Sequence, residues 1–287
     1  IDKYFLINKL IYVEGKNNIK LNNIKLNKKF EIINFESIKA ITHKNKLKNN
    51  DFLINKKNKI LISGKVFDAE PLIKSLYKKS ENKTFSKNFN NDIEANIDKI
   101  VFGTNDDVFK LRAVASIKKG SFNKLSLKGN FSDNEIIEMS IYQTSNNTKT
   151  IQVLSDRARP FVKNFDFIEG FERGTLEYES IVTKHKSQSN LIIADFKVSK
   201  VPVLAQLFTL ASLKGIADTL SGEGISFDLF EMKSNSEGNV MNIEDALATG
   251  PAVSILLDGY IDKGNIVSLS GTLVPATKLN SIIASIP

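Results

Sequence analysis

Several residue types that often carry chemistry are rare or missing in this chain. Its 287 residues include no cysteine, no tryptophan and only two histidines. Without cysteine, the protein has no disulfide bonds, no thiolate nucleophile and no zinc site built on cysteine. His43 and His185 lie far apart in the sequence, each in polar, lysine-rich surroundings, so two separate solvated side chains are favoured over a metal or acid–base pair.

Motifs of catalysis and nucleotide binding are also missing. The chain has no phosphate-binding loop, no dinucleotide glycine fingerprint, no Gly-x-Ser-x-Gly elbow and no zincin helix. The acidic pairs 106–107 and 244–245 fall where turns or strand ends are expected, and such positions favour turn-stabilising or solvated roles. We therefore expect a protein that is not an enzyme and that needs no cofactor or metal.

The composition is that of a folded protein with an uneven charge. It is 41% hydrophobic and 25% charged, which excludes global disorder. Residues 1–100 hold 21 lysines against 11 acids, whereas residues 101–287 hold 19 bases against 21 acids. A lysine-rich first third favours an anionic partner or is simply a solvated face. Because no arginine cluster or nucleic-acid motif accompanies it, we do not expect nucleic acid to be the partner.

The two ends of the chain suggest a piece of a longer protein. It begins at Ile1 without an initiator methionine or a signal peptide, and it closes on Ile286-Pro287, where a helix is expected to start. We therefore expect any membrane anchor to lie outside this sequence.

Short runs with alternating apolar and polar residues dominate the chain. Such runs, broken by asparagine, lysine and glycine, are typical of antiparallel strands with one apolar and one wet face. The predicted strands cover residues 18–22, 23–27, 29–33, 59–64, 94–102, 107–114, 122–129, 136–142, 170–180, 225–233, 239–248, 252–262 and 266–274.

Three segments change to a helical period. Asp68 can cap a short amphipathic helix over residues 70–79, with Pro71 in its first turn, and residues 155–165 form a second short helix. Residues 202–221 form an apolar helix, either a lid packed on the sheet or a segment resting on a membrane surface. Its polar residues argue against a membrane span. The apolar side chains of this helix are Val203, Leu204, Leu207, Phe208, Leu213 and Ile216.

Four segments of the second half carry a family resemblance. They are residues 151–165 with the Ser155-Asp156-x-Ala158 turn, residues 169–176 with two glycines, residues 196–227 across the apolar helix, and residues 258–287. In this order they resemble the AsmA-like superfamily of bacterial envelope proteins, and most of all its YhdP-type members. Residues 1–60 match no part of that family.

The resemblance implies a fold and a function. The fold would be mainly β, a long twisted antiparallel sheet folded into an open apolar groove, with a few short amphipathic helices. The chain would be part of a periplasmic protein anchored in the inner membrane by a segment missing here. Such a protein would conduct phospholipids between the inner and outer membranes, and this fragment would touch membrane only at or beyond its ends.

We expect two domains, a β-meander over residues 1–150 and the AsmA-like C-terminal region over residues 151–287. Three alternatives stay open: a closed, lipid-free core, a structural factor for outer-membrane protein assembly, and a β protein that binds a polyanion through its lysines. Alternate apolar residues on the strands are the candidates for a lipid-contacting surface. They are Val108, Leu111, Leu125, Leu127, Ile181 and Ile192.

Overall fold

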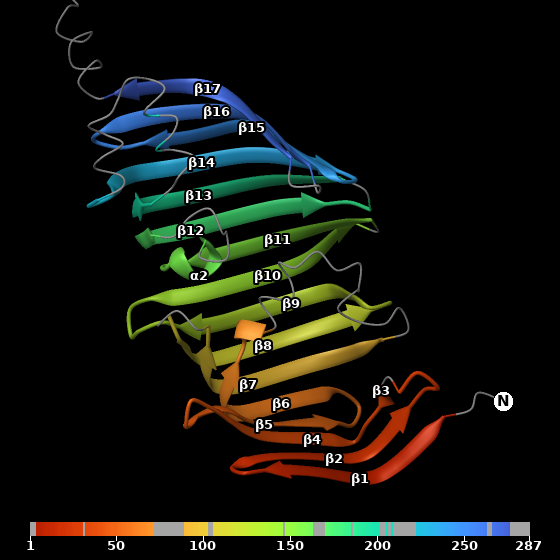
Figure 1. Ribbon diagram of the computed structural model, residues 1–287. Coiled ribbons are helices and arrows are strands. Elements are labelled where there is room, and N and C mark those ends of the chain that lie inside the picture. Colours follow the sequence, from red (N-terminus) through yellow and green to blue (C-terminus); the bar gives the residue numbers. More distant parts are fainter. Residues whose placement is uncertain are drawn as a thin grey trace, which may run out of the picture. The chain divides into compact units, whose positions relative to one another are not determined.

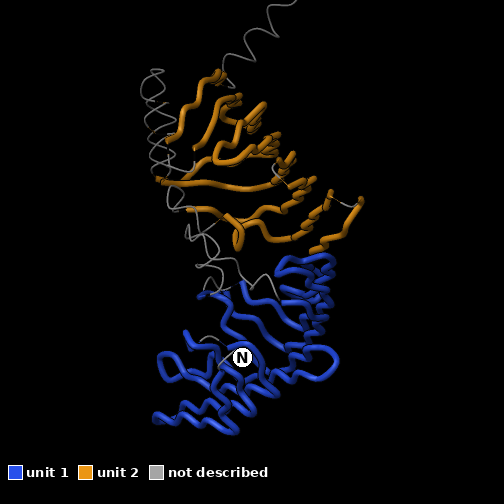
Figure 2. Tube along the Cα trace, turned by 90° about the vertical axis from the view of Figure 1, so that its right-hand side faces the viewer, with its two compact units in different colours: residues 1–138 blue, residues 139–287 orange. Residues whose placement is uncertain are grey.

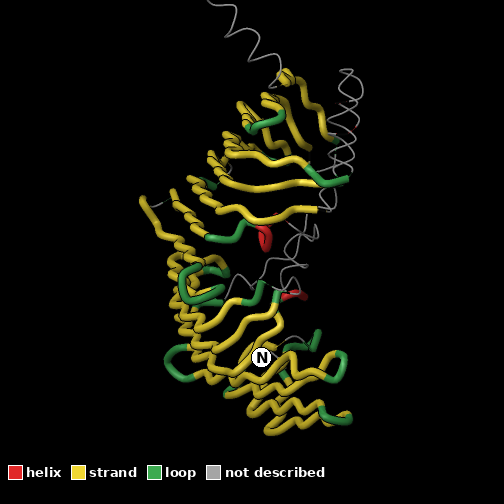
Figure 3. Tube along the Cα trace, turned by 90° about the vertical axis from the view of Figure 1, so that its left-hand side faces the viewer, coloured by secondary structure: helices red, strands yellow, loops and turns green. Residues whose placement is uncertain are grey.

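Strands make up 77% of the described protein (Figure 3). The computed structural model describes residues 4–30, 32–71, 89–102, 106–145, 147–162, 170–184, 186–200, 205, 208, 222–262 and 266–275. The strands belong to one twisted, mixed sheet of 17 strands that is not closed (Figure 1). This confirms the predicted mainly β class and the open sheet.

The chain divides into two compact units, residues 1–138 and residues 139–287 (Figure 2). The division falls inside β10 (Ile136–Ser145). The predicted domain boundary at residue 150 lies one strand later, inside β11 (Thr148–Ser155).

Unit 1 contains the first nine strands. They pair in the order β1-β2-β4-β5-β6-β7-β8-β9, and β3 pairs with the end of β2. The strands are β1 (Phe5–Glu14), β2 (Asn17–Leu26), β3 (Ile32–Asn34), β4 (Ser37–Lys44), β5 (Leu47–Lys56), β6 (Ile60–Asp68), β7 (Asn91–Val101), β8 (Val108–Lys118) and β9 (Ser121–Asn130).

One pair in unit 1 departs from the predicted antiparallel meander. β6 and β7 are parallel, with Ile60 opposite Ile93. Parallel neighbours need a connection that returns the chain to the starting end of the sheet, and residues 69–90 supply it. The prediction of an entirely antiparallel sheet was therefore wrong at this pair.

The predicted strands 18–22 and 23–27 form one strand, β2. Asn23 lies in its middle with φ at +48°. Asparagine adopts this left-handed conformation more readily than most residues, so it kinks the strand without ending it. The asparagine that seemed to punctuate the sequence therefore marks a bend, and pairing with β1 continues on both sides of it.

Asp68 at the end of β6 has the predicted role of a helix cap. The Glu70 backbone N–H donates to Asp68 Oδ1 (3.1 Å), and residues 70 and 71 are helical. Asp68 is 7% exposed and is tied to β5 as well, because Asn49 Nδ2 donates to Asp68 Oδ2 (2.9 Å) and the Asp68 N–H donates to Asn50 Oδ1 (2.9 Å). Residues 72–79 of the predicted helix lie outside the described residues.

Unit 2 is an antiparallel meander in chain order from β11 to β17. A single turn of helix, α2 (Arg159–Val162), falls within the predicted helix 155–165, and residues 163–165 lie outside the described residues. The remaining strands are β12 (Gly170–Val182), β13 (Lys186–Ser199), β14 (Ile225–Glu237), β15 (Val240–Thr249), β16 (Val253–Asp262) and β17 (Val267–Pro275).

Three stacked phenylalanines form the centre of unit 2. The centroid of the Phe196 ring lies 5.4 Å from that of the Phe171 ring on β12 and 5.4 Å from that of the Phe227 ring on β14. The interplanar angles are 12° and 17°. All three are buried, in a cluster that includes Ala158 and Val162 at α2. Aromatic pairs add a favourable term beyond their buried area, so this row joins three adjacent strands on one face.

Replacing Asp68 with alanine should lower the free energy of unfolding by about 1 kcal/mol, because a helix cap and a bond to β5 are lost together. Asp68→Asn is the matched control, since its amide oxygen can still accept from the Glu70 N–H. Urea unfolding followed by circular dichroism measures both variants. An Asp68→Ala midpoint equal to that of the unmodified protein would show that these bonds do not stabilise unit 1.

Candidate functional site: an apolar sheet face in unit 1

A continuous row of apolar side chains crosses all eight principal strands of unit 1. Residues directly opposite each other on neighbouring strands share a face, so the register identifies the row. We call it the central row. It consists of Leu10, Leu21, Ile38, Ile54, Ile62, Ala95, Ala113 and Leu127, each paired with the next.

Apolar rows flank the central row on the same face, because side chains two residues apart along a strand point the same way. Together the three rows are the apolar face of unit 1. One flanking row is Tyr12, Ile19, Ala40, Phe52, Gly64, Ile97 and Leu111, and the other is Ile60, Ile93, Ala115 and Leu125.

The opposite face of the same strands is mostly polar and basic. It is identified by the row that alternates with the central row along each strand. That row consists of Ile11, Lys20, Lys39, Leu53, Ser63, Asn96, Arg112 and Lys128. Ion pairs occupy part of this side of the sheet, including Lys128 with Glu138 (2.7 Å) and Lys59 with Glu94.

Most side chains of the apolar face are half-buried. Ile38, Ile54, Ile62 and Leu127 are all of this kind, and none of them is sealed from solvent. Adjacent strands lie about 4.8 Å apart, so the seven steps of the central row span roughly 34 Å. One leaflet of a bilayer has a hydrocarbon thickness of about 15 Å, so the row is about two acyl chains long.

The corresponding face of unit 2 is covered by the chain itself. Phe208, which is helical, is 0% exposed and packs in the cluster with Ile193, Phe196 and Ile255, and α2 packs against β12. Of the six side chains predicted for the apolar helix, only Phe208 is described; Val203, Leu204, Leu207, Leu213 and Ile216 lie outside the described residues. Its burial supports the lid interpretation over a helix resting on a membrane. No helix among the described residues is long and apolar enough to span a bilayer.

The structure brings three of the predicted lining residues together. Leu111, Leu125 and Leu127 lie on the apolar face of unit 1. Val108 is 0% exposed, and its Cγ1 fills the space in which a side chain on Gly129 would stand, so a ligand cannot reach it. We therefore leave Val108 out of the proposed lining.

Ile181 and Ile192 lie on the other face of the unit 2 sheet from its buried cluster. Ile192 is paired with Glu177 and Glu231, and Ile181 is 42% exposed and paired with Gln188. Their polar neighbours and exposure therefore place both outside an apolar lining. The alternating pattern of a single sequence does not show which member of each pair points inward, so this assignment could not be made from the sequence.

Most of the apolar face was missed by sequence reasoning. Ile38, Ile54 and Ile62 each sit in an alternating run, which is the signal that would have found them. The runs of β4 and β5 are interrupted by lysine and asparagine, however, and only the register reveals that their apolar residues form one row.

Groups able to carry out chemistry are dispersed. Asp107 pairs with Lys99 (2.6 Å), Glu244 accepts from Asn235 (2.7 Å), and His43 lies opposite Lys48. His185 is outside the described residues. Among the described residues, no three histidine, aspartate or glutamate side chains gather as metal ligands would.

Two exposed groups have shifted pKa values, and both shifts are away from neutrality. The hydrogen bond from Lys44 Nζ to Glu70 Oε2 (2.9 Å) raises the pKa of Lys44, and the bond from the Tyr12 hydroxyl to Glu14 raises the pKa of Tyr12. Neither group is therefore tuned for proton transfer near pH 7.

Comparison with protein-family models, curated proteins and solved structures gives no match in any of the three. Support for a function therefore comes from the apolar face of unit 1 and from the family resemblance of the sequence.

Phe208→Ala should destabilise unit 2 by about 3–5 kcal/mol, because it empties a fully buried site. Leu154→Ala is the control, since Leu154 on β11 is 48% exposed, and it should change stability by about 0.5 kcal/mol or less. Hydrogen exchange read by mass spectrometry would locate the effect. Unchanged protection of β12–β14 in Phe208→Ala would show that the helix does not stabilise this face.

Proposed function

We propose that this chain is part of an envelope protein that conducts phospholipids between the inner and outer membranes, along an apolar sheet face. The observation that carries the proposal is the unbroken central row from Leu10 to Leu127, in which every side chain except the exposed Leu10 is half-buried. The periplasmic location, the inner-membrane anchor and the two membranes come from the resemblance of residues 151–287 to the AsmA-like superfamily.

The mechanism is passive and needs no catalytic residue. An acyl chain in water exposes apolar surface at a cost of about 0.8 kcal/mol per CH₂ group. Against the apolar face that surface is covered, while the headgroup remains in water beyond the row. Every position along the row offers much the same aliphatic contact, so a chain moving from one strand to the next meets no strong barrier.

The two-sided chemistry of unit 1 supports lipid over a purely structural role. A scaffold needs both faces of its sheet covered or polar, whereas here one face is aliphatic across eight strands and the other carries lysine and arginine. The structural alternative requires the apolar face to be closed off by protein. The two alternatives therefore differ in what occupies that face.

The decisive experiment is lipid analysis of the chain purified without detergent from a bacterial host. Organic extraction and mass spectrometry should recover phospholipid at near-stoichiometric amounts. Leu125→Glu should reduce the recovered lipid about tenfold or more, because an ionised carboxylate beside the acyl chain must lose its hydration.

Ser126→Glu supplies the matched control. Ser126 is the next residue on the same strand, faces the other side and is exposed, so the same charge there should leave lipid recovery unchanged. Equal lipid loss in both variants would remove the face-specific interpretation. A lipid-free, monodisperse unmodified protein would favour the structural or assembly factor.

A further inference from the structure

One end of the β1, β2 and β3 strands presents large apolar side chains to solvent. Leu6 is 64% exposed, Phe30 70% and Ile33 52%, and Tyr4, Phe5 and Ile32 are about half exposed. Monomeric proteins seldom leave such residues grouped together without an interaction partner. We call this group the β1–β3 tip. It consists of Tyr4, Phe5, Leu6, Leu26, Phe30, Ile32 and Ile33.

Four side chains of the tip form one connected patch, those of Phe5, Leu26, Phe30 and Ile32. Leu26 is paired with Phe5 on one side and with Ile32 on the other. The Phe30 ring stacks on the Phe5 ring, with centroids 5.2 Å apart and an angle of 10°. The stack extends the patch beyond the ends of the strands, onto the loop.

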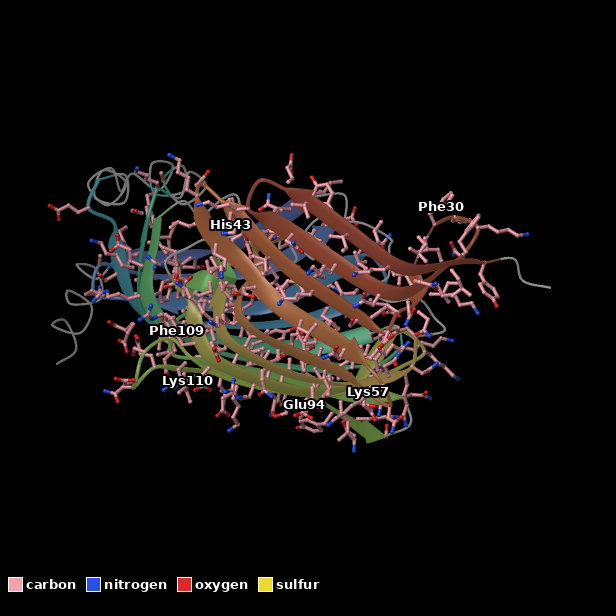
Figure 4. All side chains as sticks on the ribbon, turned by 90° about the horizontal axis from the view of Figure 1, so that it is seen from below. Phe30, His43, Lys57, Glu94, Phe109 and Lys110 are labelled. Atoms are coloured by element: carbon pink, nitrogen blue, oxygen red, sulfur yellow. The ribbon has the colours of Figure 1, made fainter. Side chains whose placement is uncertain are left out.

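The loop holds Phe30 outward at a conformational cost. Phe30 has φ at +61°, which is unfavourable for a bulky residue. Two hydrogen bonds stabilise this turn. The Phe30 N–H donates to the Asn27 carbonyl (3.0 Å), and the Lys29 N–H donates to Asn27 Oδ1 (2.9 Å). Figure 4 shows Phe30 at the outer end of these strands, away from His43 at their other end. Local strain that displays an aromatic ring to solvent points to a function for that ring.

Lysines surround the patch. Residues 16–33 contain five lysines and one acid, Glu31. Lys28 and Lys29 are exposed beside Phe30, and Lys25 Nζ lies 3.7 Å from the centroid of the Tyr4 ring. An apolar patch with a basic border matches a bilayer surface, where acyl chains lie beneath anionic headgroups.

We propose that the β1–β3 tip binds the surface of a bilayer that contains anionic phospholipid. Phe30, Phe5 and Ile32 enter the headgroup–acyl boundary, and Lys25, Lys28 and Lys29 contact the phosphates. A nucleic acid would use the lysines and the aromatic rings but would leave Leu6, Ile32 and Ile33 in water. This contact goes beyond the proposed function, because membrane attachment at the tip does not require lipid on the apolar face.

A single tryptophan reports the contact directly, because the chain has none of its own. In Phe30→Trp, vesicles of phosphatidylcholine with phosphatidylglycerol should shift the emission to the blue and protect it from acrylamide. Leu47→Trp is the matched control. Leu47 is 74% exposed between Lys46 and Lys48, at the start of β5 and at the opposite end of the strands, and its emission should not change.

Vesicle co-sedimentation of the full chain then separates the two components of binding. Phe30→Ser should weaken binding about tenfold, the scale for withdrawing one large apolar side chain from contact. The double variant Lys28→Glu, Lys29→Glu should weaken it further, and high salt should weaken binding of the unmodified chain. Leu47→Ser and Lys46→Glu are the corresponding controls and should bind as the unmodified chain does. Circular dichroism confirms that each variant is folded.

Several results would overturn the proposal. Unshifted emission of Phe30→Trp with anionic vesicles would do so, as would equal binding of Phe30→Ser and Leu47→Ser. So would salt-sensitive binding of an oligonucleotide that fails with the lysine variant and is unaffected by Phe30→Ser, because it would identify a polyanion site. Failure of the tip proposal alone leaves lipid recovery from the Phe30→Ser chain high. Failure of the groove removes that lipid, so lipid recovery distinguishes the two failures.

Discussion

The register between neighbouring strands is the constraint on which unit 1 depends. Side chains alternate between the two faces of a strand, so a slip of one residue between any two strands would send one half of the central row to the basic face. None of the register irregularities in the β1–β9 pairings displaces a residue of the central row. The eight residues stay in line although the register shifts near Leu26, Thr42, Phe52, Lys110 and Ile117. Bends and bulges are therefore accommodated without breaking the apolar path.

The two units put the same kind of strand to different uses. In unit 2 the apolar face meets Phe208 and α2, and the covered side chains become a tightly buried core. In unit 1 most side chains of the apolar face remain half-buried, and Leu10 and Tyr12 on β1 are exposed. The same two-faced architecture thus supports a closed core in unit 2 and a partly accessible apolar surface in unit 1.

The sequence predicts strands well where the alternation is strong and uninterrupted, as in β8, β9 and β16. It also predicts the Asp68 cap, because both cap and helix start are local. It does not predict the β6–β7 parallel pair, because the direction in which residues 69–90 return is a property of the whole sheet. Nor does it assign faces: Leu125 and Ile192 have similar local patterns, yet the neighbours supplied by distant strands place one on the apolar face and the other between glutamates.

The parallel β6–β7 pair also bears on how unit 1 folds. Every other pair of principal strands in this unit is joined by a shorter connection, whereas β6 and β7 are separated by the 22 residues that follow Asp68. Closing a longer loop carries a larger entropic cost before any contact forms, and non-local pairing slows folding. Because their connections are shorter, we expect the hairpins on each side to form before the step that joins them. Until it does, the edges of β6 and β7 are open to pairing with other chains, so this seam is the point at which a nascent chain most needs protection.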